Sequence, residues 1–242
     1  MYDGRHGFVS RYGKGLLEYV PANKSLSVLD LGCGTGTLTK ELSLRAGEVL
    51  GVDASGEMIR RARELYPGVK FEVLDALAME WENKWDIVFS NAVFHWIPRH
   101  DRLLANVFRC LKKGGRLVCE FGAKGNIGRI EGAFSRALSA KGGVYKSPFY
   151  FPSPEDYAEL LQCAGFTMEE LYDYERPTLL EDGEKGLENW MRQFFADHLE
   201  RVSPDEYASL FRQVEQELKP SLWDGTRWVA DYRRMRVVAV KL

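Results

Sequence analysis

The sequence predicts an α/β fold of the doubly wound type, with helices packed on both faces of a mostly parallel sheet. Three observations predict it. Apolar segments alternate with amphipathic ones from Asp30 to Phe121, a glycine-rich turn follows the first apolar segment, and the second apolar segment ends in Asp53, about twenty residues after the first glycine of that turn. A repeated strand and helix order requires parallel strands joined by right-handed crossovers.

Size and composition limit the classes of protein that the chain can represent. Its 242 residues are 45% hydrophobic, which suits one α/β domain with insertions. The net charge of −2, with both signs mixed along the chain, argues against a nucleic-acid partner and favours a small-molecule partner. The four cysteines form no CxxC pair, and three of them lie in apolar surroundings typical of buried thiols. We therefore expect a reduced, cytoplasmic protein, and leave its oligomeric state open.

No segment indicates export or a membrane partner. The N-terminus lacks a basic region followed by an apolar one, and no run approaches about eighteen apolar residues. Before the first strand, apolar residues recur at helical spacing over residues 8–20, and Pro21 ends the pattern. This segment is interpreted either as a helix packed on the sheet or as a flap over a bound ligand.

The expected elements follow from periodicity and from helix end signals. Strands are expected at residues 28–31, 49–53, 69–74, 85–90, 116–121, 166–174 and 234–241. Helices are expected at residues 38–45, 55–66, 101–111, 154–163, 190–199 and 204–218, with Asp101 as the cap of the third. We expect a single domain over 1–242, with an N-terminal cap at 1–24, a cofactor-binding core at 25–123, and helical lid insertions at about 124–153 and 177–228.

The stretch VLDLGCGTGTLT, Val28 to Thr39, reads as strand, tight loop and helix. A loop folded against a ligand brings bare backbone close to it, and a Cβ on Gly32, Gly34 or Gly36 would obstruct that approach. The helix that begins near Gly36 aims its unpaired N–H groups and positive dipole end at the same place. The stretch predicts a site for an acidic or carboxylate-bearing, nucleotide-like ligand, with a plain strand-to-helix corner as the alternative.

Glycine spacing separates two classes of cofactor. Asp53 stands where such folds bind a ribose hydroxyl, and an acid there disfavours a 2′-phosphate. The dinucleotide fingerprint is GxGxxG, whereas this chain has GxGxG, with Thr37 in place of the third glycine. The spacing disfavours NAD, and an NAD-dependent oxidoreductase remains an alternative.

With Asp30 just before the loop, DLGCGTG resembles motif I of the class I S-adenosylmethionine-dependent methyltransferases. WDIVFSNAVFHW is similar to motif IV of that family, and LKKGGRLVCEFG to the region that follows it. The resemblance covers about residues 27–123 and, loosely, the last two strands. NAVFHWI, EFGAKGN and the DYRR ending are similar to the trans-aconitate methyltransferases and the related type 11 methyltransferases.

This resemblance implies S-adenosylmethionine as cofactor, S-adenosylhomocysteine as product, and a Rossmann-like, seven-stranded sheet with an antiparallel C-terminal strand. An N-terminal flap would cover the ligand. The residues expected to contact the cofactor are Tyr12, Gly32, Cys33, Gly34, Gly36, Asp53, Ala54, Met58, Asp75, Ala76, Ser90 and Asn91.

Two of these residues have alternative interpretations. Met58 is expected either to pack on the adenine ring or to be an ordinary core residue. Asp75, at the end of the third strand, would accept from the adenine amino group while the Ala76 N–H donates to the ring, and the alternative for Asp75 is a helix N-cap.

Beside the transferable methyl group, backbone carbonyls near Ser90 and Asn91 would accept from the cofactor's ammonium group. His95 is the candidate catalytic residue, as a donor, an orienting group or a base, with a structural histidine as the alternative. His95 and His100 lack a zinc-binding arrangement, so no metal is expected.

The resembled group esterifies small carboxylates, which identifies a small-molecule carboxylate as a candidate acceptor. An ionised carboxylate needs no base, whereas a hydroxyl or amine acceptor would need His95 to remove its proton. Arg5, Arg11 and Arg129 are the candidates for contacts with a polycarboxylate. A non-catalytic cofactor-binding module on the same fold is a further alternative.

Overall fold

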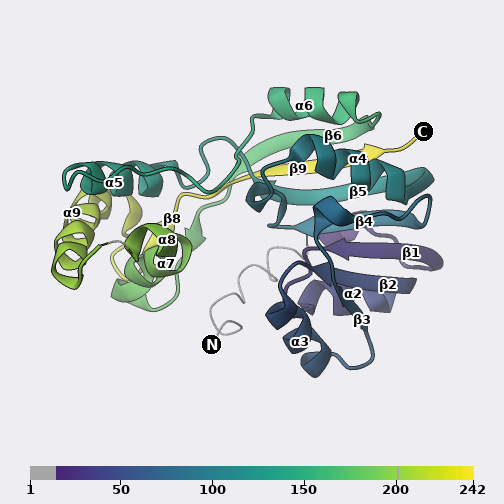
Figure 1. Cartoon of the computed structure of the whole chain (residues 1–242), viewed down its shortest axis with the longest axis horizontal. Helices are drawn as coiled ribbons and strands as arrows, with labels where there is room; N and C mark the ends of the chain where they lie inside the picture. Colours follow the sequence, from purple (N-terminus) through teal and green to yellow (C-terminus); the bar gives the residue numbers. More distant parts are fainter. Residues whose placement is uncertain (1–14, 201) are drawn as a thin grey trace. The chain divides into compact units, whose positions relative to one another are not determined.

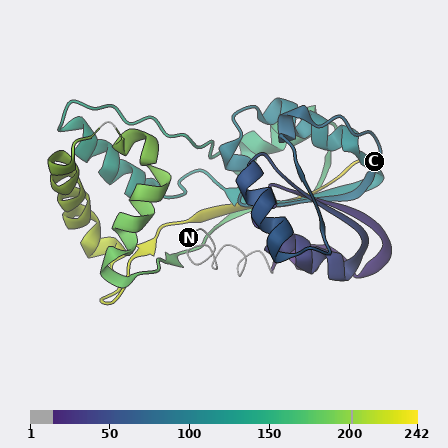
Figure 2. The ribbon, with the colours of Figure 1, turned by 60° about the horizontal axis from the view of Figure 1, so that its bottom comes forward.

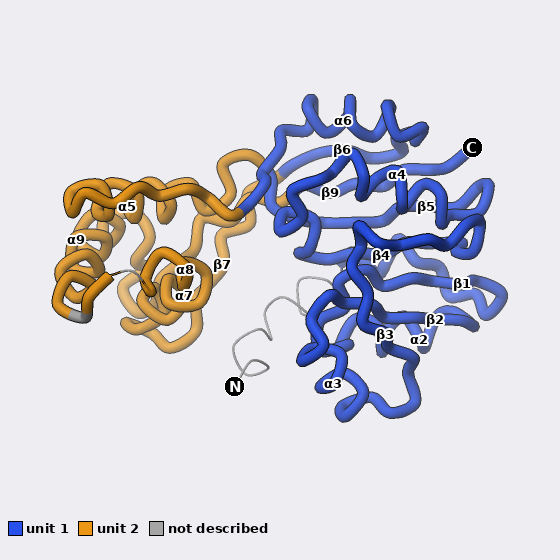
Figure 3. Tube along the Cα trace, viewed as in Figure 1, with its two compact units in different colours: residues 1–123, 149–173, 235–242 blue, residues 124–148, 174–234 orange. Residues whose placement is uncertain are grey.

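The computed structural model describes residues 15–200 and 202–242, which divide into two compact units (Figure 3). Unit 1 comprises the described residues up to 123 together with 149–173 and 235–242, and unit 2 comprises 124–148 and 174–234. The expected lid insertions fall largely in unit 2. Residues 149–153, however, belong to unit 1, where the Tyr150 N–H donates to the His95 carbonyl. The expectation of a single domain stays a prediction.

A seven-stranded sheet forms the centre of unit 1, in the order β3-β2-β1-β4-β5-β9-β6 (Figure 1). Its strands are β1 Asn23–Leu31, β2 Ala46–Asp53, β3 Lys70–Val73, β4 Trp85–Asn91, β5 Leu111–Gly122, β6 Thr167–Glu175 and β9 Arg233–Val240. The pairs from β3 to β5 are parallel. Lys241 exchanges backbone hydrogen bonds with Gly114 and Gly115, so β9 ends where β5 begins and runs antiparallel to it. The predicted doubly wound sheet with an antiparallel C-terminal strand is confirmed.

Helices cover both faces of this sheet, as the turned view of Figure 2 shows. They are η1 Leu16–Tyr19, α2 Thr37–Arg45, α3 Gly56–Leu65, η2 Ala76–Ala78, η3 Phe94–Trp96, α4 His100–Cys110 and α6 Pro154–Cys163. Neighbouring strand residues alternate between two apolar layers. Leu29 packs with the layer beneath α4 and α6, and Val28 with the layer beneath η1 and α2. Because both faces are buried, the central strands are almost wholly apolar.

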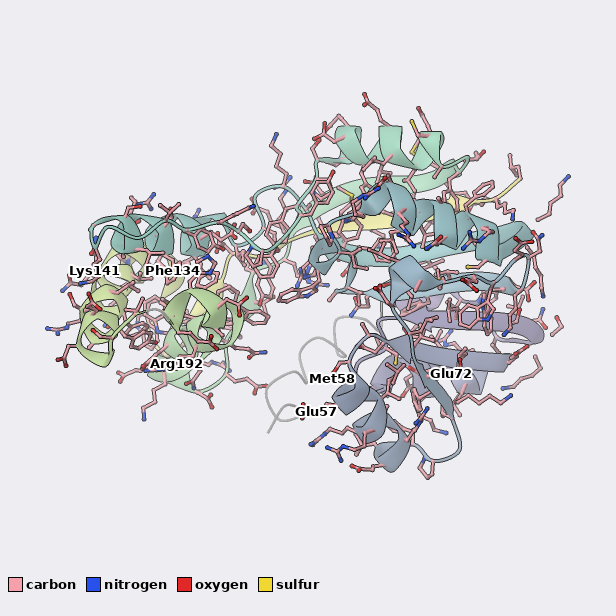
Figure 4. The ribbon with its side chains drawn as sticks, in the orientation of Figure 1. Glu57, Met58, Glu72, Phe134, Lys141 and Arg192 are labelled. Carbon is pink, nitrogen blue, oxygen red and sulfur yellow. The ribbon has the colours of Figure 1, made fainter. Side chains whose placement is uncertain are left out.

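Unit 2 consists mainly of helices. They are α5 Gly128–Ser139, η4 Gly183–Lys185, α7 Gly186–Phe194, α8 Ala196–Leu199 and α9 Pro204–Leu222, with the short strands β7 Thr178–Leu179 and β8 Val229–Ala230. Phe134, labelled in Figure 4, stacks on Phe195 with ring centroids 4.5 Å apart. A capping box between Ser203 and Glu206 begins α9. Aromatic contacts such as those of Phe195 with Phe134 and Trp190 help to hold this unit together.

Several element ends differ from the prediction. β1 begins at Asn23 rather than Val28, because its first residues pair with β2 while their side chains stay exposed and give no apolar signal. α4 begins at His100, and no side chain caps it. The expectation that Asp101 is the cap is wrong, since its carboxylate pairs with Arg99 instead. Of the predicted N-terminal helix, the described part is the single turn η1.

Two further observations concern the whole described chain. None of the helices in the described ranges combines the length and the apolar character that crossing a membrane requires. The four cysteines are free thiols: Cys110 and Cys119 are buried, Cys33 is half-buried and Cys163 is exposed. The expectation of three buried thiols therefore holds for two.

Candidate cofactor and acceptor site

Most of the predicted site residues meet at one edge of the sheet, where the parallel strands end. Asp53 lies opposite Val73, so Asp75 follows on the neighbouring strand end. Leu31 lies opposite Val52, which places the glycine loop beside Asp53. β4 runs parallel to β1 and brings Ser90 and Asn91 to the same edge. This is the edge at which doubly wound folds bind their ligands.

The structure explains the three glycines of the loop, Gly32, Gly34 and Gly36, in different ways. All three have positive φ, +78° at Gly32, +55° at Gly34 and +85° at Gly36. A Cβ on Gly32 would collide with the side chain of Val93, and one on Gly36 would lie 2.5 Å from the ring of Phe71. Among the residues that the structure describes, none comes within 4 Å of a Cβ placed on Gly34. The protein's own side chains account for Gly32 and Gly36, and the expectation that a Cβ on Gly34 would obstruct a ligand stays a prediction.

Asp53 holds the loop in place, a role that the strand pattern did not predict. Its Oδ2 accepts from the Gly34 N–H at 2.9 Å, and its Oδ1 accepts from the Ser55 N–H at 2.8 Å. Asp-x-Ser is an Asx-turn pattern, so a signal for the second bond was present in the sequence. A carboxylate oxygen has a second lone pair, so both oxygens retain capacity for hydroxyl donors. Asp53 is thus a fixed, half-buried acceptor beside open backbone.

The residues predicted around an adenine ring flank Asp53. Ala54 is exposed. Met58 is half-buried in the first turn of α3, where Figure 4 labels it, and its N–H donates to Ser55 Oγ at 3.3 Å. Asp75 is exposed, and its Oδ1 accepts from the Leu77 N–H, so it caps η2. The capping alternative is therefore observed, and it is compatible with ligand binding because a carboxylate accepts several bonds. Ala76 is buried.

At the end of β4, Ser90 and Asn91 are both buried. The Ser90 hydroxyl donates to the Leu31 carbonyl at 2.7 Å, so this side chain ties β4 to β1. The next residue, Ala92, has a left-handed φ of 61°, and its N–H donates to the Glu120 carbonyl at 2.7 Å. This turn leads the chain directly into η3, which carries His95.

Beneath the glycine loop lies a buried acid, Asp30, which accepts a 2.6 Å hydrogen bond from the Thr39 hydroxyl. Burial, reinforced by the charge of Asp53 and opposed by the Thr39 bond, raises the pKa of Asp30 to about 7. Burial likewise raises the pKa of the Cys33 thiol. Cys33 is therefore an uncharged loop residue and no nucleophile.

His95 is buried and held by backbone groups. Its Nδ1 accepts from the Gly122 N–H at 3.2 Å, and its carbonyl accepts from the Tyr150 N–H at 2.9 Å. The rings of Phe149 and Phe151 lie with centroids 5.9 and 5.7 Å from that of His95. The sequence pattern assigns these phenylalanines to a lid insertion. Their pairing with His95 depends on tertiary packing and has no local signal.

A second buried histidine, His100, holds η3 in place through a ring nitrogen. His100 Nε2 lies 3.1 Å from the Phe94 carbonyl, and Nδ1 lies 3.2 Å from the Tyr157 hydroxyl. Because a carbonyl only accepts, Nε2 carries the proton and Nδ1 accepts from Tyr157. Burial lowers the pKa of His100 to about 4, while its bond to Phe94 and the charge of Asp101 act in the opposite direction. His100 is thus a neutral structural residue.

This shift predicts a pH-dependent contribution to stability. In the unfolded chain His100 binds a proton below its ordinary pKa of 6.5, whereas in the folded chain it binds one only below about pH 4. The contribution of neutral His100 to stability is therefore complete above pH 6.5 and is lost as the pH falls. We expect the stability advantage of the wild type over His100→Gln to shrink by roughly 3 kcal/mol between these limits. Urea unfolding of both proteins across this range measures it. Asp30 titrates in both proteins, so its effect cancels in the comparison. A stability difference that stays constant with pH would contradict the assignment of His100.

A buried ion pair joins β5 to β9 and had no sequence signal. The guanidinium group of Arg236 donates to the Glu120 carboxylate from Nε at 3.1 Å and from Nη2 at 2.5 Å. Arg236 also lies over the Tyr19 ring, 5.6 Å from its centroid, and the Tyr19 hydroxyl donates to Glu170 at 2.7 Å. The two charged partners stand 116 positions apart. Their pairing fixes the register of the antiparallel strand beside the end of β5.

The remaining residues expected to contact a ligand are Tyr12, Arg5, Arg11 and Arg129. Tyr12, Arg5 and Arg11 lie outside the described residues. Arg129 is exposed at the start of α5, and its backbone N–H donates to Asp231 at 2.7 Å. In the described part of the chain, no group of three or more histidine, cysteine and acidic side chains is arranged to hold a metal ion.

The fold and this edge of the sheet together define an α/β protein with a nucleotide-cofactor loop. The residues fit an adenosyl cofactor, since backbone around Gly34 is open and a fixed carboxylate stands beside it. The family model described as "Methyltransferase domain" matches residues 28–115.

Relatives extend the similarity over the whole chain. An uncharacterised methyltransferase of Schizosaccharomyces pombe is 35% identical over 99% of this chain and 96% of its own length. A trans-aconitate 2-methyltransferase of Methylobacterium nodulans is 31% identical over 93% of this chain and 90% of its own. The YcgJ protein of Bacillus subtilis shares the fold, with a TM-score of 0.69 at 15% identity over 96% of this chain and 98% of its own. The chain belongs to the class I S-adenosylmethionine-dependent methyltransferases.

Proposed function

We propose that this enzyme transfers the methyl group of S-adenosylmethionine to a carboxylate of a small-molecule acceptor, with S-adenosylhomocysteine as the second product. The observation that carries the proposal is the similarity to a trans-aconitate 2-methyltransferase over 93% of the chain, which extends far beyond the matched domain at residues 28–115. A tricarboxylate such as trans-aconitate is therefore the first acceptor to test. A cytoplasmic location and the absence of a nucleic-acid partner belong to the same proposal.

The proposed cofactor contacts follow from the geometry of the site. Asp53, held by two backbone N–H groups, would accept from the ribose hydroxyls. Bare backbone at Gly34 would lie against the ligand, and Met58 would pack on the adenine ring. Asp75 and the Ala76 N–H would bind the edge of that ring.

Backbone carbonyls near Ser90 and Asn91 would receive the ammonium group. When bound, the cofactor supplies an electrophilic methyl group: the new O–CH3 bond forms as the S–CH3 bond breaks, the electron pair stays on sulfur, and the charges of carboxylate and sulfonium cancel.

The chain's own contribution to such a reaction is mainly alignment. Holding an acceptor oxygen in line and away from bulk water lowers a barrier by up to about 7–11 kcal/mol. An ionised carboxylate has no proton to lose, so no general base is required. An NAD-dependent oxidoreductase is not favoured, because the matched methyltransferase family and the glycine spacing of the loop both favour S-adenosylmethionine over NAD.

The test combines binding and transfer. Calorimetry with S-adenosylhomocysteine is expected to show binding, and incubation with S-adenosylmethionine and trans-aconitate is expected to give a methyl ester that mild alkali hydrolyses. Propane-1,2,3-triol, which has hydroxyls in place of carboxylates, is the matched acceptor control. Transfer to the triol or to amines alone would overturn the carboxylate proposal. Cofactor binding without transfer to any acceptor in a broad metabolite screen would favour a non-catalytic module.

A further inference from the structure

We propose that Val93 is a positioning residue that couples the glycine loop to η3, so that a cofactor bound against the loop also restrains the turn that follows β4. This inference rests on the proposed function, because the ligand that it invokes is the cofactor of the same site. Val93 is not among the cofactor contacts proposed above. Three features of unit 1 support its role: its contact with Gly32, the attachment of its backbone, and the short connection from Gly32 to Gly34.

The first feature is the closeness of the Val93 side chain to the backbone of Gly32. A Cβ built on Gly32 would lie 2.2 and 2.5 Å from the two Cγ atoms of Val93 and 2.8 Å from its Cβ. Carbon atoms in contact lie about 3.5–4.0 Å apart, so the valine occupies the space in which a side chain of residue 32 would stand. Valine is also stiff at χ1, so its branches follow the position of its own backbone.

The second feature is the attachment of the Val93 backbone to the rest of unit 1. Just before it, the Ala92 N–H donates to the Glu120 carbonyl of β5 at 2.7 Å. The carbonyl of Val93 accepts from the Trp96 N–H at 2.9 Å, which closes the turn of η3. η3 is bonded in turn to α4 and to residues 149–151. Val93 therefore joins the glycine loop, through its side chain, to a turn that is hydrogen-bonded to three other parts of the unit.

The third feature is the short, bonded connection within the loop itself. The N–H groups of Gly32 and Cys33 both donate to the Val52 carbonyl, at 2.8 and 2.9 Å. Gly34 follows two residues after Gly32, and its N–H donates to Asp53. Because both glycines are held by β2, the loop has little freedom to bend between them. A ligand that lies against the backbone of Gly34 would therefore restrain Gly32 as well.

These contacts give the coupling a role in the reaction. Packed groups transmit a restraint when each one limits the motion of the next. A cofactor held against the loop would reduce the motion of Gly32 and, through Val93, the motion of η3 and residues 149–151. This turn lies in the stretch that resembles motif IV, which is expected beside the transferable methyl group. Val93 would thus order the methyl side of the site once the cofactor is in place.

Hydrogen exchange of backbone amides, followed by NMR with and without saturating S-adenosylhomocysteine, tests this coupling without a measurement of activity. The reporters are the amides of Trp96 and Tyr150, because both donate hydrogen bonds within or onto η3. In the wild type the ligand is expected to slow their exchange by about fivefold or more. In Val93→Ala, which lacks both Cγ atoms, the slowing should fall below about twofold. Undiminished slowing in Val93→Ala, or no slowing in the wild type, would overturn the inference.

Two further variants separate this contact from a general loosening of η3. Val93→Thr keeps both branches at Cβ and should retain the slowing. Ile97→Ala truncates a partly buried side chain at the other end of η3, which packs against the same core, and leaves Val93 in place. The slowing should persist there at about threefold or more. If Ile97→Ala abolished it as Val93→Ala does, loosening of η3 would explain the effect and the inference would fail.

A double-mutant cycle tests whether the contact positions the loop. In the wild-type background, Gly32→Ala is expected to weaken the binding of S-adenosylhomocysteine by about tenfold or more. In the Val93→Gly background, where all three close carbon atoms are gone, the same change should cost less than about threefold. Backbone strain from the positive φ of residue 32 is common to both backgrounds and cancels. Equal losses of affinity in the two backgrounds would overturn the inference, and the exchange experiment decides it if Gly32→Ala does not fold.

Failure of the wild type to bind S-adenosylhomocysteine would contradict the proposed function instead. Urea unfolding of the four proteins of the cycle would then still test the contact. Gly32→Ala should lower the urea midpoint less in the Val93→Gly background than in the wild-type background, because the added Cβ finds room there. Equal shifts of the midpoint in both backgrounds would overturn the role of Val93.

Discussion

Gly34→Ala is expected to weaken the binding of S-adenosylhomocysteine by about 10- to 100-fold while the protein stays folded. The added Cβ meets no atom of the described residues within 4 Å, so we expect it to enter space that the ligand would occupy. Forcing one extra carbon into a filled site costs about 1–3 kcal/mol, which corresponds to this loss. Calorimetry gives the affinity, and urea unfolding gives the stability.

Gly114→Ala is the matched control for this prediction. Gly114 also has a positive φ, +78°, and a Cβ added to it would meet no atom within 4 Å in the described ranges 15–200 and 202–242. It stands near the beginning of β5, at the end of the sheet away from the glycine loop. Both variants should lose about 1–2 kcal/mol of stability through left-handed backbone strain, but only Gly34→Ala should lose affinity. Equal affinities in the two variants would remove the loop from the binding site.

Asp53→Ala is expected to lower the affinity for S-adenosylhomocysteine by about 100-fold. The substitution removes the proposed acceptor of the ribose hydroxyls, and hydrogen bonds to charged groups are worth about 1.5–3 kcal/mol each. It also removes the bonds from the Gly34 and Ser55 N–H groups, so the loop loses its anchor. Calorimetry measures the affinity, and the same unfolding experiment separates loss of binding from loss of stability.

Glu57→Ala is the comparison that isolates position from charge. Glu57 is an exposed acid in the first turn of α3, four residues beyond Asp53, and Figure 4 labels it beside Met58. Removing it changes the net charge by the same amount without touching the glycine loop. We expect its affinity to stay within about threefold of the wild type. If both variants lost affinity equally, a general electrostatic effect would replace the specific one proposed for Asp53.

By itself, the sequence determined the alternation of strands and helices from β1 to β5, the glycine loop, and the placement of Asp53 and Asp75 on neighbouring strand ends. These features were readable because each depends on local periodicity, turn chemistry or the rule that parallel strands end at one edge. Exact element ends were less readable. The start of β1 pairs through backbone atoms with exposed side chains, which leave no apolar pattern.

Tertiary structure alone decided how the individual side chains are used. It showed that Val93 and Phe71 explain two of the three loop glycines, and that the Gly122 N–H donates to His95 Nδ1. It also paired Glu120 with Arg236 across 116 positions. Such contacts arise when segments distant in the chain are packed together, and the direction of one N–H group depends on that packing, so no local pattern of residues encodes them.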